Sequence, residues 1–448
     1  MGLPIRVAFV SVYAYLAVSI SVVAAEKIDL SPLRQPDGLT QVSVELEATG
    51  STLVRSESDE KASKTPERRL PMNATARLRY AERNFPGRNP GRSGISLLAV
   101  RYYELAEATI NVDEKAVAPR LAEDRRLIVV ASATPRPILY SPKGPLKREE
   151  LDLVDVLASS SVIDQLLPGK AVADGDSWPA EPAAVAALLT LDSIAVCEVQ
   201  SVLEEFNANF AKVRVAGVVH GTAEGAATEQ EIRGVYLFDR NLRRITRLNL
   251  ALREKRSIGG ATPGLDAVAK LQIKLEPIKS CPQLDDSNIK TLAPPEGGIL
   301  LDLAYDAPTL GFQLRHDRQW FITSEEREAV TLRRVDGNDV VAQCTLVSLP
   351  PKSAGRQTTL EQFQKDVLYS LGKNVGELVR TRQWQNSHEH YCYEVVVRGK
   401  VEQMPVEWHH FLVARESGHR VSLAVTVEGP MVERVASADR AVVERLKL

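Results

Sequence analysis

The chain has 448 residues, 44% of them hydrophobic and 25% charged, as in ordinary globular proteins, and this length predicts two or three domains. A formal net charge of −2 argues against a nucleic-acid-binding protein, which would carry a basic excess. Only 5% of the residues are aromatic, which also argues against an extensive base-stacking surface.

The first 25 residues have the three parts of a secretory signal peptide. Arg6 provides the positive charge, Val7–Val23 is largely apolar, and Val23-Ala24-Ala25 places small residues where a signal peptidase cuts. We therefore predict an exported protein, periplasmic or extracellular. An uncleaved anchor is the alternative. No later stretch approaches the ~18 uninterrupted apolar residues that a transmembrane helix requires.

Export with cleavage after Ala25 is a testable prediction. N-terminal sequencing of the exported chain is expected to begin at Glu26, because the small residues end at Ala25. A mature envelope-associated chain that still begins at Met1 would show an uncleaved anchor instead.

Residues 26–279 are predicted to form a β-rich domain. Alternation of apolar and polar residues indicates a strand at Gln41–Ala48, and Leu97–Val112 is ambiguous between helix and strand. Further strands are expected at Asn73–Arg83, Arg125–Ala133, Lys212–Val219 and Ala269–Pro277, and a hairpin joins Glu231–Asp239 to Arg244–Lys255. Three short helices are expected at Lys147–Leu157, Ser161–Leu167 and Glu181–Leu189.

Residues 280–298 are predicted to be a linker, because they contain Pro282, Pro294, Pro295 and a glycine pair without apolar periodicity. Residues 299–448 then form the second domain. In it, Thr358 and Glu361 have the spacing of a capping box, and a helix is expected from there to Gly372. Strands are predicted at Glu377–Gln385, His388–Arg398, Val401–Ala414 and Arg420–Glu428, before a last helix at Ser437–Leu446.

The second region resembles the PsbP-like family from Gly311 to Leu448. The matching segments are LGFQLRHDRQW, TTLEQFQKDVLYSLG, the hairpin around Arg398-Gly399-Lys400, and VSLAVTV before the final helix. The resemblance implies an antiparallel sheet flanked by helices and a non-enzymatic accessory role.

The region from about Gln41 to Ile278 is similar to LolA-like and LppX-like periplasmic carriers. The supporting segment is GVYLFDRNLRRITRLNL, in a strand-rich second half that follows the predicted helices. That resemblance implies a curved half-barrel that holds lipid chains on a hydrophobic concave face. Together the two regions predict an α+β fold, with a half-barrel-like domain covered by helices and then a sheet flanked by helices.

The strongest candidate for a metal site is His388, His390 and Cys392 with His409. Alternation along a strand places the first three on one face, and a tight turn near Gly399-Lys400 would bring Cys392 opposite His409. Residues two apart on a strand project in parallel about 6.6–7 Å apart, so they do not converge on one ion. We therefore predict no metal at these residues. No cofactor and no catalytic residue is predicted elsewhere in the chain either.

No nucleophile motif of the G-x-S-x-G type is present, and Ser159-Ser160-Ser161 is interpreted as a helix start. The pair Glu149-Glu150 is expected to face solvent. The four cysteines, Cys197, Cys281, Cys344 and Cys392, could form up to two disulfides or remain small buried thiols.

The predicted function is an exported, non-enzymatic binding or carrier protein with a hydrophobic ligand in the first domain. The alternative is an envelope scaffold, an accessory subunit of a larger complex. Under either hypothesis the expected partner is an unknown protein or a hydrophobic ligand, and not a nucleic acid. Peripheral association with a membrane is a further alternative. A cavity lined by aliphatic side chains would favour the carrier, and a filled core would favour the scaffold.

Overall fold

The computed structural model describes residues 26–448 except 34–37, 56–66, 86–95, 133–136, 290–291, 293–300 and 354–357. The predicted signal peptide lies outside the described residues. Of those described, 59% lie in strands and 15% in helices. The α+β prediction is therefore wrong, because the chain is mostly β, with large antiparallel sheets.

The predicted helices are shorter, and the strands longer, than an α+β fold requires. The helices predicted between residues 147 and 189 are one or two turns long: α1 (Arg148–Val154), the 3-10 turn η2 (Ile163–Leu166) and α2 (Pro182–Leu188). The ambiguous segment at Leu97–Val112 is wholly strand, β4 (Ser96–Val112). Strands β2 (Leu39–Arg55) and β3 (Glu67–Asn84) run far beyond the windows in which their alternation is clear.

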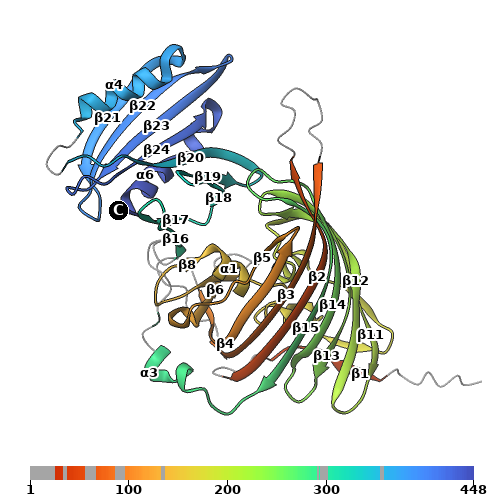
Figure 1. Ribbon diagram of the computed structural model, residues 1–448. Helices are drawn as coiled ribbons and strands as arrows, with labels where there is room; N and C mark the ends of the chain where they lie inside the picture. The colour runs from red at the N-terminus through yellow and green to blue at the C-terminus, as the bar shows by residue number, and fades with distance from the viewer. Residues whose placement is uncertain are drawn as a thin grey trace, which may run out of the picture.

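The first region, residues 26–289, is built on one strongly curved sheet of twelve strands within the described residues (Figure 1). The order is β10-β11-β12-β13-β14-β15-β2-β3-β4-β6-β7, with β5 paired to β4. The remaining bounds are β5 (Lys115–Val117), β6 (Leu127–Ser132), β7 (Pro137–Tyr140), β10 (Ser177–Pro179), β11 (Ser193–Phe206), β12 (Phe210–Ala223), β13 (Ala226–Asp239), β14 (Arg244–Arg256) and β15 (Gly264–Pro277). The predicted hairpin is confirmed as β13 and β14.

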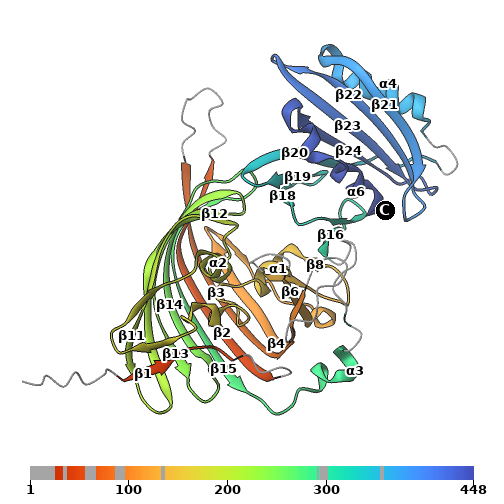
Figure 2. The ribbon, with the colours of Figure 1, turned by 180° about the vertical axis from the view of Figure 1, so that it is seen from behind.

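The two faces of this sheet differ in polarity, as the alternation predicts. Val42 and Val44 of β2 are buried, whereas Glu45 and Glu47, which follow them on the opposite face, are exposed. The valine face is concave, and α1, η2 and α2 lie against it (Figure 2). The first region also contains a two-stranded sheet, formed by β1 (Lys27–Asp29) and β9 (Ala171–Ala173). It further contains the 3-10 turn η1 (Glu123–Arg125).

The second region, residues 301–448, contains a seven-stranded sheet in the order β18-β19-β20-β24-β23-β22-β21. Their bounds are β18 (Trp320–Glu325), β19 (Ala329–Asp336), β20 (Asp339–Leu349), β21 (Val375–Gln385), β22 (Tyr391–Val401), β23 (Met404–Ala414) and β24 (Arg420–Glu428). Helix α4 (Leu360–Leu371) packs on one face and α6 (Ala438–Glu444) on the other. The N-cap of α4 is Thr359, one residue later than predicted. The 3-10 turn η5 (Gly372–Asn374) links α4 to β21. The 3-10 turn η6 (Gly429–Met431) and the one-turn helix α5 (Val432–Val435) link β24 to α6.

A separate four-stranded sheet joins the two regions. Its order is β25-β17-β16-β8, and β8 (Leu146–Lys147) comes from the first region, whereas β16 (Leu303–Ala307), β17 (Phe312–His316) and β25 (Leu446–Lys447) come from the second. Leu303 belongs to the core of the first region. Part of the predicted linker also packs there, since η3 (Pro282–Leu284) and α3 (Asp286–Ile289) bury Leu284 and Ile289 against the sheet.

Candidate functional site

The predicted histidine and cysteine constellation is not brought together. The turn between β22 and β23 lies at Glu402-Gln403, so Cys392 pairs with Val413 and His409 pairs with Val396. His388 and His390 precede β22, and the ring of His390 accepts the backbone N–H of Leu448. All four cysteines are unpaired thiols. Among the described residues, no group of three His, Cys, Asp or Glu side chains could hold a metal ion.

His409 has a different role, between two buried carboxylates. Its Nε2 lies 2.9 Å from Glu407, and its Nδ1 hydrogen-bonds Asp439 of α6. Arg398 donates to the same Glu407 at 2.8 Å. Burial opposes the charged imidazolium, but the bonds and charges of Asp439 and Glu407 outweigh it and raise the pKa of His409. The cluster fastens α6 to the sheet, and it is a structural ion network.

The concave face of the first region is packed. Aliphatic side chains of α1, η2 and α2 form one core with the inward residues of the sheet, for example Leu151, Leu166 and Val185 against Val44 and Ile273. A carrier whose ligand lies beneath these helices would therefore need them to move away.

A fully buried ion pair anchors this packing. Arg101 of β4 donates to Glu82 of β3 at 2.8 Å, and the two side chains are 2% and 0% exposed. Arg101 also donates to Ser159 at 2.6 Å, and Ser160 donates to Glu82 at 2.6 Å. The guanidinium lies 4.8 Å from the ring of Tyr80. The serine triplet is thus a tether that binds the segment before η2 to the sheet.

The junction between the regions depends on two arginines. Arg148 of α1 donates to the carbonyl of Arg318 at 2.6 Å, and its guanidinium lies 4.5 Å from the ring of Phe321. Arg318 in turn donates to the carbonyls of Leu139 and Leu301. Each region therefore supplies an arginine to the backbone of the other.

The turn between β12 and β13 touches the second region as well. Gly225 has φ +72°, and a Cβ there would lie 2.7 Å from the carbonyl oxygen of Gly337 and 2.8 Å from Val335. Only glycine suits this position, because the backbone is left-handed and the two turns approach so closely.

Between these contacts lies a hollow of about 500 Å³, which we call the junction hollow. Its size is within the range of small-molecule sites, which often lie between domains. The first region supplies residues of α1, of β7 and of the ends of β11 and β12, and the second supplies the segment before β18 and the β19–β20 turn. The lining is Pro137, Ile138, Arg148, Leu151, Asp152, Asp155, Asp192, Ser193, Thr222, Glu224, Gly225, Arg318, Gln319, Phe321, Val335, Gly337 and Asn338.

Asp152 is the least compensated charge of this lining. Its nearest cation, Arg148, is 4.0 Å away, and 54% of its side chain is exposed. Poor solvation among the surrounding protein atoms raises the pKa of Asp152 to about 7. Arg148 opposes the shift, and the carboxylates of Glu224 and Asp155 add to it.

Asp152→Asn is expected to raise the thermal midpoint at pH 8 and to leave it unchanged near pH 3. In the unfolded chain this carboxyl ionises near 3.8, and in the folded chain near 7. Between these values the folded state binds more protons, so wild-type stability falls as the pH rises, whereas asparagine does not titrate. Scanning calorimetry checks this, with Asp174→Asn, an exposed carboxylate, as the control. Equal midpoints of Asp152→Asn and wild type at pH 8 would contradict it.

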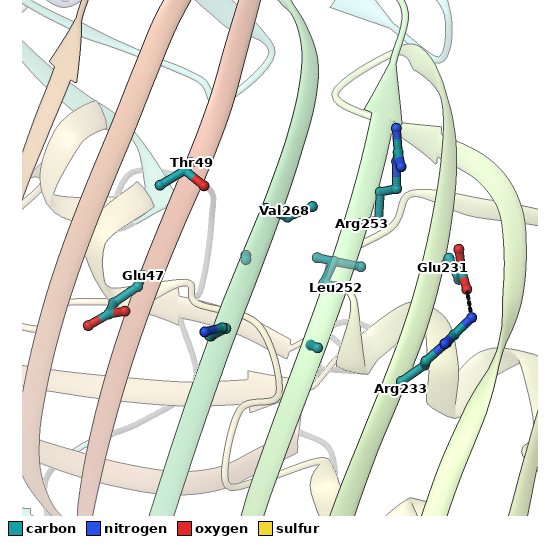
Figure 3. Close-up of a pocket in the computed structure, with 10 residues that line it drawn as sticks. Glu47, Thr49, Glu231, Arg233, Leu252, Arg253 and Val268 are labelled. Carbon is teal, nitrogen blue, oxygen red and sulfur yellow. Dashed lines mark hydrogen bonds and ion pairs between the residues drawn. The ribbon is translucent and has the colours of Figure 1, made fainter.

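A second hollow, of about 410 Å³, lies on the convex face of the first region (Figure 3). Four adjacent strands, β2, β15, β14 and β13, line it, and Val268 and Ala251 lie among charged side chains such as Glu231, which pairs with Arg233 at 2.6 Å. Its charges are mixed and solvated, as is typical of an exposed sheet face. The junction hollow is the better candidate, because two parts of the chain close around it.

The sequence did not reveal this site. Asp152 and Asp155 stand one helical turn apart, and this spacing is the available signal. However, Arg318 and Phe321, which line the hollow from the other region, follow more than 160 residues later. The adjacent Glu149-Glu150 pair was expected to face solvent. Glu150 is instead buried and accepts the N–H groups of Ala122 and Lys147, both at 2.9 Å.

No family model and no curated protein matches the chain. Among solved structures, cyanobacterial PsbP (CyanoP) from Synechocystis is 13% identical, covering 36% of this chain and 99% of that one, with a TM-score of 0.27. A Pseudomonas aeruginosa protein of unknown function, PA94, is 10% identical over 32% of this chain and 94% of its own (TM-score 0.23). The outer membrane protein OprD of that organism is 8% identical over 89% and 95%, with a TM-score of 0.13.

A PsbP-like structure is thus among the structural neighbours of the chain. The family models give no support to the LolA-like and LppX-like resemblance. Scores this low carry no argument about function. Among the described residues, no helix is both long and apolar enough to cross a membrane.

Proposed function

We propose that the chain is an exported, non-enzymatic binding protein that holds a small ligand in the junction hollow. The observation that carries the proposal is the hollow itself, of about 500 Å³, with walls from two regions that meet through β8 and β16. Such a site closes around a ligand from both sides, and ligand binding would then favour the docked arrangement. The signal-like N-terminus supports export.

The alternative is an accessory subunit of an envelope complex. The packed concave face of the first region favours it over a carrier with a buried ligand, because a filled core leaves no interior space for lipid chains. In that case the binding partner would be another protein and not a small ligand.

Native mass spectrometry of the full chain purified from its own host tests the proposal. We expect a retained small mass in the wild type and its loss in Asn338→Trp, because Asn338 is an exposed turn residue whose replacement would fill the hollow. The control is Asn209→Trp, in the exposed β11–β12 turn at the other end of β12. A retained partner protein without a small mass, or a small mass that Asn338→Trp still retains, would overturn the proposal.

A further inference from the structure

If the junction hollow holds a ligand, as proposed above, its lining also selects the chemical class of that ligand. We infer that it takes an amphiphilic cation, whose positive head pairs with Asp152 and whose apolar part lies along Leu151 and Phe321.

The cations of the hollow are committed to the protein itself. Arg148 donates to the carbonyl of Arg318 at 2.6 Å and stacks on Phe321. Arg318 donates to the carbonyls of Leu301 and Leu139. An anionic ligand would have to compete with these bonds, which also hold the two regions together.

The carboxylates of the hollow are compensated unequally. Glu224 pairs with Arg256 at 3.2 Å, and Asp192 accepts the N–H of Gly225 at 3.3 Å. Asp152 makes no hydrogen bond within the described part of the chain, and Arg148, 4.0 Å away, is mainly engaged elsewhere. The other charged groups around Asp152 are Glu149 of α1, Asp155 directly after this helix, Glu224 and Asp192 of the first region, and Arg318 of the second.

The junction hollow also offers apolar side chains for the tail of such a ligand. Leu151, next to Asp152 in α1, is buried, and Val335 approaches from the second region. Ile138 and the ring of Phe321 complete an apolar wall. A positive head with an aliphatic tail therefore matches both parts of the lining, whereas a bare metal ion would leave this wall in contact with water.

Binding should also be linked to protons. A cation needs the ionised carboxylate, and the pKa of Asp152 is raised to about 7, so the site is mostly protonated at pH 6 and mostly ionised at pH 8. Affinity for a permanent cation is therefore expected to fall about tenfold from pH 8 to pH 6.

Isothermal titration calorimetry with the full chain tests this, using octylammonium and octanoate, which share a tail and differ in head charge. We expect octylammonium to bind at pH 8 at least tenfold more tightly than octanoate, with the pH dependence given above. Asp152→Asn should weaken octylammonium about tenfold at pH 8 and abolish the pH dependence. Asp174→Asn should behave as the wild type.

The outcomes separate the ligand class from the site. Equal binding of both probes, lost in Asn338→Trp, would overturn the cationic ligand while leaving the junction hollow as a binding site. Octylammonium binding that Asn338→Trp does not change, or no binding of either probe, would overturn both. Octylammonium binding that is lost in Asn338→Trp, weakened in Asp152→Asn and retained in Asn209→Trp would support both.

Discussion

Arg101→Met is expected to lower the free energy of unfolding of the first region by about 3–5 kcal/mol, as found when one partner of a buried ion pair is removed. The substitution keeps an aliphatic stem but leaves the carboxylate of Glu82, which is fully buried, without its cation. The two serine tethers to Arg101 also lose their donor. Urea unfolding followed by circular dichroism measures the loss.

A second variant separates charge from packing. In the double variant Glu82→Gln with Arg101→Met, no buried charge remains unpaired, so it should be more stable than Arg101→Met alone. Arg68→Met breaks the exposed pair with Asp113, whose side chains are 66% and 44% exposed, and should change stability by less than about 0.5 kcal/mol. A loss from Arg101→Met no larger than that from Arg68→Met would show that the serine tether does not hold the helices to the sheet.

The regular strands were predictable because their environment is simple. In β13 and β14, one face meets the core and the other meets water, so apolar and polar residues alternate and the turn at Arg240-Asn241 is marked by polar residues. The helix α4 was also clear, since Phe363 and Val367 form its buried stripe, although its N-cap is Thr359 and not the predicted Thr358.

The alanine- and leucine-rich segments are the reason that the sequence predicts an α+β fold for a chain that is mostly β. Segments such as Pro182–Leu188 are rich in alanine and leucine, which favour helix, yet the helix ends after seven residues because the chain must return to the sheet at β11. Conversely, β4 contains Glu104, Leu105 and Ala106, which favour helix, and pairing with β3 and β6 overrides that preference.

Register and long-range contacts were beyond the sequence. A turn placed a few residues too early, at Gly399-Lys400 instead of Glu402-Gln403, was enough to set Cys392 wrongly opposite His409. The junction hollow depends on the approach of Arg148 to Phe321 and of Gly225 to Gly337. No local pattern encodes contacts between residues so far apart, and the acidic residues of α1 look like an ordinary solvated face until the second region docks.

Trp320→Ala is expected to cost about 3–5 kcal/mol in the unfolding of the second region, the usual range for a large buried aromatic side chain. Trp320 begins β18, is 0% exposed, and packs in the core that α6 also covers. It also stands at the junction, because Arg148 donates to Arg318 two residues before it. Its removal should therefore weaken both the core and the docking of the two regions.

Trp320→Phe tests whether the ring or its N–H matters. The indole Nε1 of Trp320 is buried with no hydrogen-bond partner among the described residues, so phenylalanine keeps most of the ring and removes an unsatisfied donor. It is expected to cost less than half as much as alanine in urea unfolding. Trp384→Ala is the control, because that ring is only partly buried beneath Arg440, whose guanidinium lies 4.8 Å away. If Trp320→Ala cost no more than Trp384→Ala, Trp320 would not be the anchor of this core, and the second region would depend instead on the β22–β24 side of its sheet.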